Sequence, residues 1–235
     1  MHIIKFSCKA ALLATLALSF QTNAEDWSGC YLGAHIGHGK GDNQLDILRF
    51  QDITYENRSA GSASSSGSMY GAQFGCDYQT SEKWVSGVQF SASKLDMNGE
   101  HLFIDGNGPN NYVNYDSDQS LSIVGKFGYL LKDTSMLYAK LGWVTTNQVY
   151  TDTDPDYDPP LFYQKSLSRK GWTVGVGFEH KFRDYVSYFF EVNHLALGRE
   201  DNILFDNLGL IAIDDYEAAV DQSANLFTAG LNFYF

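Results

Sequence analysis

Four charged residues stand apart among glycine, small polar and apolar neighbours, and their types could do chemistry. They are two lysines and two glutamates: Lys126, Lys140, Glu179 and Glu191. Buried carboxylates beside lysines can transfer protons, and in a membrane protein such charges can also line a gated polar pathway. The same groups can instead form ion pairs that only fill space. The elements that hold the four residues decide between these interpretations.

An acidic stretch offers a second candidate, because its carboxylates recur at every other residue as in a calcium-binding loop. The residues are Asp152, Asp154, Asp156 and Asp158. A calcium-binding EF-hand would require Gly at its sixth position and Glu at its twelfth, where this chain has Tyr157 and Tyr163. A solvated acidic loop is the favoured interpretation, and a loose divalent-cation site is the weaker alternative.

Neither cofactor binding nor catalysis is predicted from the remaining polar residues. The histidines outside the N-terminal segment are His35, His38, His101, His180 and His194, and their positions favour roles as filler or interfacial residues over haem ligation. The nearest acid and histidine, Glu191 and His194, should point to opposite faces of one strand, with no serine beside either. We therefore expect no enzyme active site.

Alternation of side chains with a period of two is the main structural pattern. In the last eleven residues, NLFTAGLNFYF, apolar side chains that include Phe233 and Phe235 alternate with small or polar ones. A strand that ends the chain on an aromatic residue is typical of bacterial outer-membrane barrels, and we interpret Phe233 and Phe235 as the C-terminal assembly signal. The same alternation recurs seven times upstream.

The pattern predicts eight strands, with boundaries that are uncertain by a few residues. The strands are expected near 28–40, 68–78, 84–94, 118–130, 136–146, 169–182, 186–197 and 222–235. Long connections (41–67, 95–117, 147–168 and 198–221) alternate with tight ones (79–83, 131–135 and 183–185), and 59–68 reads as flexible loop. Apolar residues occupy one face of every strand, with aromatic residues near both ends. We predict an all-β fold, an eight-stranded antiparallel up-and-down transmembrane β-barrel.

The N-terminal residues resemble a signal peptide, so we expect residues 1–24 to be a signal peptide and 25–235 to form the barrel. Removing residues 1–24 takes away Lys5 and Lys9, which leaves 14 basic and 28 acidic residues. An acidic chain of this kind is unsuited to nucleic acid.

In such a barrel Lys126, Lys140, Glu179 and Glu191 all face inward, and we expect them to share one layer. An eight-stranded barrel has an interior that side chains fill, so the charges must pair or be hydrated. A salt-bridged plug of zero net charge is the favoured interpretation, and a gated pathway or catalytic pair is the alternative. The charges also argue against a soluble lipocalin-like barrel, whose lumen would be apolar.

Cys30 and Cys76 share the outward parity near the same ends of two adjacent strands. A cross-strand disulfide is geometrically possible there. Two separate lipid-facing thiols are the equal alternative, because a shift of one residue in register would separate them.

Three segments carry a family resemblance: DWSGCYLGAHIGHGKG (26–41), GAQFGCDYQTSEKWVSGVQF (71–90) and GWTVGVGFEHKFRDYVSYFFEVNHLALG (171–198). With the final GLNFYF, they resemble the small porin-like outer-membrane β-barrel proteins related to the OmpA transmembrane domain and the opacity proteins. The resemblance implies the barrel fold and a Gram-negative outer membrane, but no defined ligand.

From these patterns we expect an integral outer-membrane barrel without enzymatic activity, which supports the envelope and displays acidic extracellular loops for adhesion or ligand contact. The alternatives are a narrow porin-like channel for small solutes and a lipid A-modifying barrel enzyme. The expected partners are outer-membrane lipid and lipopolysaccharide, the barrel-assembly machinery, and host or matrix ligands reached through the loops.

Overall fold

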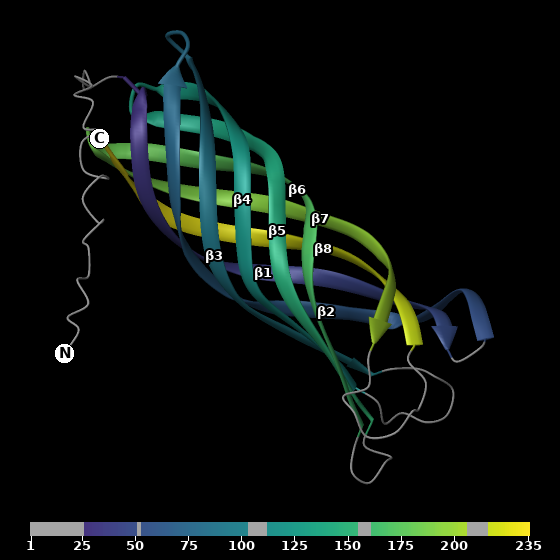
Figure 1. Cartoon of the computed structure of the whole chain (residues 1–235). Coiled ribbons are helices and arrows are strands. Elements are labelled where there is room, and N and C mark those ends of the chain that lie inside the picture. Colours follow the sequence, from purple (N-terminus) through teal and green to yellow (C-terminus); the bar gives the residue numbers. More distant parts are fainter. Residues whose placement is uncertain (1–25, 51–52, 103–111, 155–160, 206–215) are drawn as a thin grey trace, which may run out of the picture.

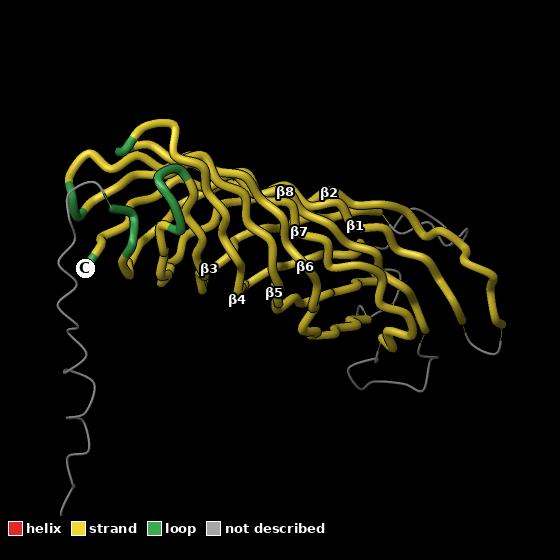
Figure 2. Tube along the Cα trace, turned by 90° about the horizontal axis from the view of Figure 1, so that it is seen from above, coloured by secondary structure: helices red, strands yellow, loops and turns green. Residues whose placement is uncertain are grey.

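The computed structural model describes residues 26–50, 53–102, 112–154, 161–205 and 216–235, and within them the regular elements are eight β-strands. Their bounds are β1 (Gly29–Phe50), β2 (Ile53–Gln79), β3 (Trp84–Leu102), β4 (Tyr112–Lys132), β5 (Ser135–Asp154), β6 (Leu161–Arg183), β7 (Val186–Phe205) and β8 (Tyr216–Tyr234). Figures 1 and 2 show these strands wrapped about one axis, with short turns at one end. In the described part of the chain, no helix has the length and apolar character needed to cross a membrane.

The strands form a closed antiparallel barrel in chain order, because β1 pairs with both β2 and β8. Closure joins Tyr31 to Tyr234 and His38 to Phe227 across the β1–β8 ladder. A closed ladder lets each strand satisfy its backbone groups on both sides, which the hydrocarbon of a bilayer requires. The predicted eight-stranded antiparallel barrel is confirmed.

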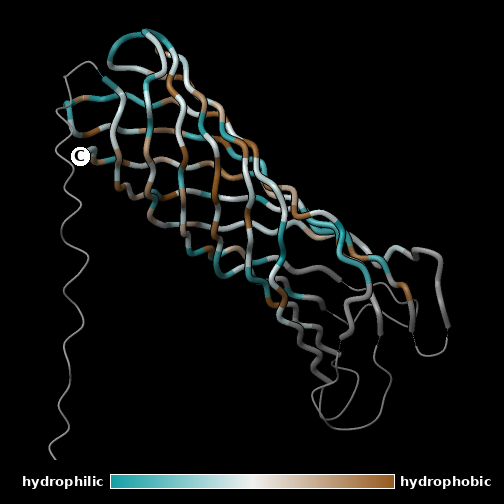
Figure 3. Tube along the Cα trace, turned by 45° about the horizontal axis from the view of Figure 1, so that its top comes forward, coloured by the Kyte–Doolittle hydropathy of each residue, from teal (hydrophilic) through white to brown (hydrophobic). Residues whose placement is uncertain are grey.

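Near the short turns and over the middle of the barrel, every strand turns apolar side chains outward, and hydrophobic and hydrophilic residues alternate along the trace in Figure 3. Exposed examples are Leu32, Ile36, Phe74, Phe90, Ile123, Leu141, Val176, Phe190 and Phe227. The exposed aromatic residues that carry a polar ring atom or lie at the strand ends include Tyr78, Trp84, Tyr129, Phe182, Tyr185 and Phe235 near the short turns, and Trp143 and Trp172 nearer the opposite end of the barrel. Such girdles mark the two interfaces of a membrane, and the short-turn end is the periplasmic one.

The strands are longer than the sequence pattern indicated. They contain 19 to 27 residues, whereas about 9–11 tilted residues cross the hydrocarbon core. The segment 59–68, expected to be flexible loop, belongs to β2, where Ser62 pairs with Gln44 and Ser66 with Lys40. The barrel wall therefore continues as β-sheet beyond the outer aromatic residues. A serine-rich segment cannot be recognised as a strand from its sequence alone, because its partner strand determines its structure.

The lumen is layered, and the inward residues of β8 show the sequence of layers. From the extracellular side they are Val220, Gln222, Ala224, Leu226, Thr228, Gly230, Asn232 and Tyr234. From Gln222 on, a polar level is followed by an apolar level at Ala224 and Leu226 and by a second polar level from Thr228 to Asn232. Tyr234 marks the aromatic periplasmic end. Glycines leave room for the large lumen side chains, because a Cβ at Gly75 or Gly177 would overlap the ring of Tyr31 or Tyr138 respectively.

Candidate functional site

The lower half of the lumen holds a group of buried charges, which we call the ionic layer: Asp77, Lys126, Lys140, Glu179 and Glu191. Its lower tier is centred on Lys126, whose Nζ lies 2.5 Å from Asp77 Oδ2 and 3.3 Å from Glu179 Oε2. Glu179 Oε1 also accepts hydrogen bonds from Ser187 Oγ, Asn232 Nδ2 and Tyr234 OH at 2.5, 2.7 and 2.8 Å.

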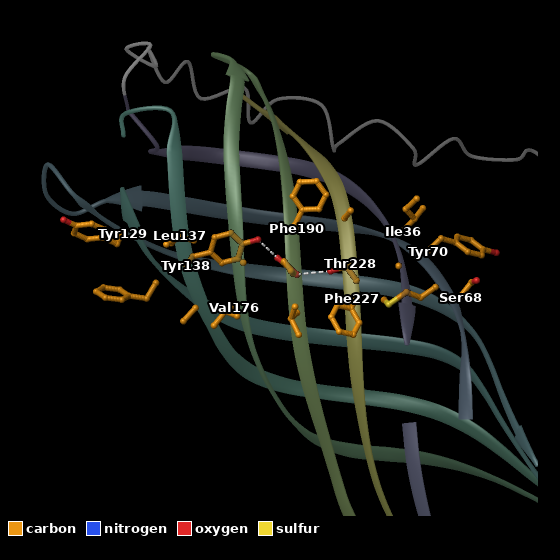
Figure 4. Close-up of a pocket in the computed structure, with 18 of the residues that line it drawn as sticks. Ile36, Ser68, Tyr70, Tyr129, Leu137, Tyr138, Val176, Phe190, Phe227 and Thr228 are labelled. Atoms are coloured by element: carbon orange, nitrogen blue, oxygen red, sulfur yellow. Dashed lines mark hydrogen bonds between the residues drawn. The ribbon is translucent and has the colours of Figure 1, made fainter. Parts of the chain in front are cut away.

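The upper tier is centred on Glu191 of β7. Lys140 Nζ donates to Glu191 Oε2 at 2.6 Å, and Tyr138 OH donates to Glu191 Oε1 at 2.7 Å. Asn193 Nδ2 and Thr228 Oγ1 donate to Oε2 at 3.1 and 3.4 Å. In Figure 4, dashed lines run from Tyr138 and Thr228 to this carboxylate from either side.

The structure corrects the expectation of one layer that contains four balanced charges. The ion pairs fall into two tiers, and Asp77 adds a third carboxylate, which was not among the predicted residues. Lys181 is a further buried lysine at this end of the lumen, where its Nζ donates to the Asp26 carbonyl oxygen at 2.9 Å and lies 4.5 Å from the ring centroid of Tyr234. The alternation along β2 could have identified Asp77, since it lies two and four residues after the inward-facing Gly75 and Gln73.

Tyrosines connect the two tiers. Lys126 Nζ lies 4.9 and 5.1 Å from the ring centroids of Tyr31 and Tyr138, and the Tyr138 hydroxyl reaches Glu191 in the other tier. A cation held against aromatic faces in a dry environment gains further electrostatic stabilisation. The tiers therefore form one packed unit.

A chain of neutral polar groups continues from the ionic layer toward β1 and β3. Asn232 Oδ1 accepts from Gln73 Nε2 at 2.7 Å, and Gln73 Oε1 lies 2.9 Å from His35 Nδ1. The other ring nitrogen of His35 lies 2.9 Å from Ser93 Oγ. Both nitrogens of His35 are thus occupied by protein partners.

The periplasmic end of the lumen is closed by an apolar and aromatic cluster. It contains Trp27, Tyr31, Val85, Leu130, Met136, Tyr138 and Tyr234. Trp27 is fully buried, and its Nε1 donates to the Asp133 carbonyl oxygen at 2.8 Å. The alternation of side chains does not place Trp27 in the lumen, because this residue precedes the first alternating strand.

Chemically, the ionic layer pairs its charges and presents no free nucleophile. Each carboxylate contacts a lysine, and the only polar side-chain atom of the layer without a hydrogen-bond partner in the described part of the chain is Asp77 Oδ1. Removing one partner of a buried ion pair strongly destabilises a protein, because the remaining charge stays buried without a counter-ion. The arrangement can hold the strands together and fill the lumen.

One serine–histidine contact was not anticipated. Ser135 Oγ lies 2.9 Å from His180 Nδ1 at the periplasmic ends of β5 and β6. The other ring contact of His180 is with Tyr188, at 5.3 Å between ring centroids. No carboxylate among the described residues orients the histidine, so the pair lacks the third member that a triad requires.

The remaining candidate residues are placed as follows. Cys30 and Cys76 are directly opposite in the β1–β2 register, and the structure joins them by a disulfide. Asp156 and Asp158 lie outside the described residues, as do the side chains of Asp152, Asp154 and His101. Among the described residues, no group of three or more His, Cys, Asp or Glu is placed to hold a metal ion. Phe233 and Phe235 face outward, 51% and 64% exposed.

Above the ionic layer lies a set of buried hydrophobic residues that we call the apolar layer: Met69, Leu95, Met97, Val144, Leu195, Leu197, Ala224 and Leu226. Between the two layers is a small cavity of about 60 Å³, lined by residues that include His35, Ser91, Ser122, Thr173 and Asn193. A polar cavity of this size has room for a few waters.

Comparison with known proteins gives a family match over most of the chain. The family model described as "Outer membrane protein beta-barrel domain" matches residues 10–235. No curated protein matches the chain significantly.

Solved structures agree on the fold. OprG from Pseudomonas aeruginosa has a TM-score of 0.59 at 12% identity, with 90% of this chain and 98% of OprG covered. The outer membrane protease OmpT from Escherichia coli has a TM-score of 0.55 at 10% identity, with coverages of 88% and 97%. At these identities the likeness concerns the fold alone.

Proposed function

Because this chain belongs to the outer membrane protein β-barrel domain family, we propose that it is a closed, non-enzymatic barrel that supports the envelope and displays an acidic surface outside the cell. The bacterial outer membrane is its location. Residues 1–24 would serve as the export leader, and Phe233 and Phe235 as the signal to the barrel-assembly machinery.

The observation that carries this proposal is the filled lumen. Two tiers of ion pairs, the aromatic cluster below them and the apolar layer above them occupy successive levels of the same narrow interior. An eight-stranded barrel has little space beyond what its side chains take up. A function that depends on the outer surface and the extracellular extension is therefore better supported than one that depends on passage through the centre.

The extracellular extension supports the second half of the proposal. Beyond the outer aromatic girdle, Asp42, Asp96 and Asp116 are exposed on three different strands, followed by Glu200 and Asp201 on β7. A surface of this charge attracts cationic peptides, and through divalent cations it can contact the phosphates of lipopolysaccharide. Cationic segments of host or matrix proteins are the corresponding adhesion ligands.

The display function can be tested with charge substitutions. Replacing Asp42, Asp96 and Asp116 together by asparagine should weaken binding of a cationic peptide such as polylysine, and the difference should shrink at high salt. Glu82→Gln, Asp133→Asn and Asp184→Asn remove the same number of exposed charges at the periplasmic turns and serve as the control. Equal polylysine binding by both triple variants would contradict the display function.

A narrow channel for small solutes is the second candidate, and the polar cavity between the ionic and apolar layers favours it. Passage would require both layers to rearrange. Planar-bilayer recording separates the two functions, because a closed barrel gives no sustained conductance, whereas a channel gives reproducible openings. Catalysis on lipid A has less support, because the Ser135–His180 contact lacks an acid among the described residues.

A further inference from the structure

A second polar layer lies in the lumen above the apolar layer, toward the extracellular end. We call it the mouth layer; it consists of Asn43, Thr146, Arg169 and Gln222, all of which are buried. The register brings them together in pairs, since Asn43 is opposite Gln222 and Thr146 is opposite Arg169. On β8 and β5 the next inward residues toward the periplasm, Ala224 and Val144, already belong to the apolar layer.

Arg169 is a buried cation that forms no ion pair with any described residue. The residue is only 1% exposed to solvent. Its Nη2 donates to the carbonyl oxygens of Gly198 and Val220 at 2.5 and 3.1 Å. Its Nε and Nη1 have no hydrogen-bond partner, and no carboxylate in the described part of the chain forms an ion pair with it. A guanidinium remains protonated at any physiological pH, so it cannot relieve its burial by losing the proton.

The neighbours of Arg169 are unsatisfied in the same way. Asn43 Nδ2 and Oδ1, Thr146 Oγ1 and Gln222 Oε1 are buried and have no hydrogen-bond partner among the residues that the structure describes. Native proteins pair most buried polar atoms, so several unpaired ones around a single cation indicate that a polar group from outside completes the layer. Water alone would satisfy the hydrogen bonds but would leave the charge uncompensated.

We propose that the mouth layer is a binding site for a small oxyanion, either a carboxylate or a phosphate. The free N–H groups of Arg169 supply the charge, and the Asn43 amide and the Thr146 hydroxyl supply neutral donors to the remaining oxygens. The mouth layer lies on the extracellular side of the apolar layer. The apolar layer stops the anion from moving deeper, because transfer of a charge past those side chains would cost its solvation without any new partner.

Carboxylate and phosphate share the chemistry that the mouth layer recognises, and direct titration distinguishes them. The full barrel, purified in a neutral detergent, would be titrated with sodium acetate and, separately, with sodium phosphate, against sodium chloride at matched ionic strength. The readouts are the ¹⁵N chemical shift of Arg169 Nε and the thermal unfolding midpoint. We expect a saturable shift and a raised midpoint with at least one oxyanion and not with chloride.

Variants make the assignment specific. Arg169→Gln should weaken the binding of the active anion by about tenfold or more, since it removes charge-assisted hydrogen bonds. Arg183→Gln removes an exposed arginine at the opposite end of the barrel and should bind like the unmodified chain. Asn43→Ala, which leaves the charge in place, should give a smaller loss and provides the comparison if Arg169→Gln does not fold.

Each outcome has a definite meaning. Saturation by acetate alone identifies a carboxylate site, and saturation by phosphate alone identifies a phosphate site. No saturable response to either anion, an equal response to chloride, or unchanged affinity in both Arg169→Gln and Asn43→Ala would overturn the proposal. None of these results depends on whether the acidic outer surface binds polylysine.

Discussion

The ionic layer and the mouth layer lie in the same lumen and are equally withdrawn from solvent, yet their hydrogen bonding differs. Glu179 and Arg169 are each 1% exposed. Glu179 contacts Lys126 and accepts three further hydrogen bonds, whereas Arg169 has two nitrogens without a hydrogen-bond partner and no acidic partner in the described part of the chain. Burial alone therefore does not indicate what a polar group does.

The difference separates a structural role from a binding role. A buried network whose charges are all paired holds its strands together and has little to offer a ligand. A buried cation that the protein leaves uncompensated weakens the apo protein and is stabilised when an anion binds. The contrast predicts that substitutions in the two layers will differ in their effect on stability.

The largest effect is expected from the ionic layer. Lys126→Met removes the cation shared by Asp77 and Glu179 and leaves both carboxylates buried. The free energy of unfolding should fall by about 3–5 kcal/mol, measured by urea unfolding in lipid vesicles. Lys132→Met changes an exposed lysine at the periplasmic end of the same strand, β4, and should stay within about 0.5 kcal/mol of the unmodified barrel. Similar free energies of unfolding for the two variants would contradict a structural role for the ionic layer.

The disulfide should have the next largest effect, and it acts at the same end of the barrel. Replacing Cys30 and Cys76 by serine frees β1 from β2 in the unfolded chain and should lower stability by about 2–4 kcal/mol. The unmodified protein should also show a mass lower by two hydrogens before reduction than after. An unchanged mass after reduction would mean that the thiols are separate.

Within the upper tier, a double-mutant cycle measures the pair itself. Lys140→Met, Glu191→Gln and the double variant should give a coupling of about 0.5–3 kcal/mol, because the two side chains are in direct contact. Lys140 with exposed Glu82 is a suitable pair for comparison and should show additive effects. Additivity between Lys140 and Glu191 would contradict the tier as described.

The smallest effect is expected from the mouth layer without ligand. Arg169→Met loses two hydrogen bonds to carbonyl oxygens but also removes an uncompensated buried charge. These contributions oppose each other, so the net change in unfolding free energy should lie within about 1 kcal/mol of zero. A loss of unfolding free energy as large as that of Lys126→Met would show that other groups of the protein compensate the charge of Arg169. The two layers would then not differ in the way described.

Much of the fold was predictable from the residues. The alternation in NLFTAGLNFYF and its recurrence established the strands and the closed barrel, and the lipid-facing parity placed Phe74, Leu141 and Phe227 outside. The ends of the strands were not predictable, because polar sequence such as SAGSASSSGS becomes strand only when a partner such as Gln44 or Lys40 lies beside it. Extended sheet beyond the membrane carries no hydrophobic signal.

The candidate site was predictable only in part, for a related reason. Parity correctly indicates that Lys126 and Glu179 point inward, since successive side chains of a strand face opposite sides. It does not say which inward residues meet. Asp77, Lys126 and Glu179 come from β2, β4 and β6, which are not neighbouring strands, and they meet across the lumen.

The sequence by itself thus determined the class of fold, the face that each strand turns to lipid and the acidic character of the surface, because these depend on local periodicity and composition. Only the tertiary structure decided that Lys126 is paired, and that Arg169 has no ion-pair partner within the described residues. The stagger between strands in a closed barrel sets the level at which each inward side chain lies. Partners across the lumen are therefore a property of the closed ladder as a whole.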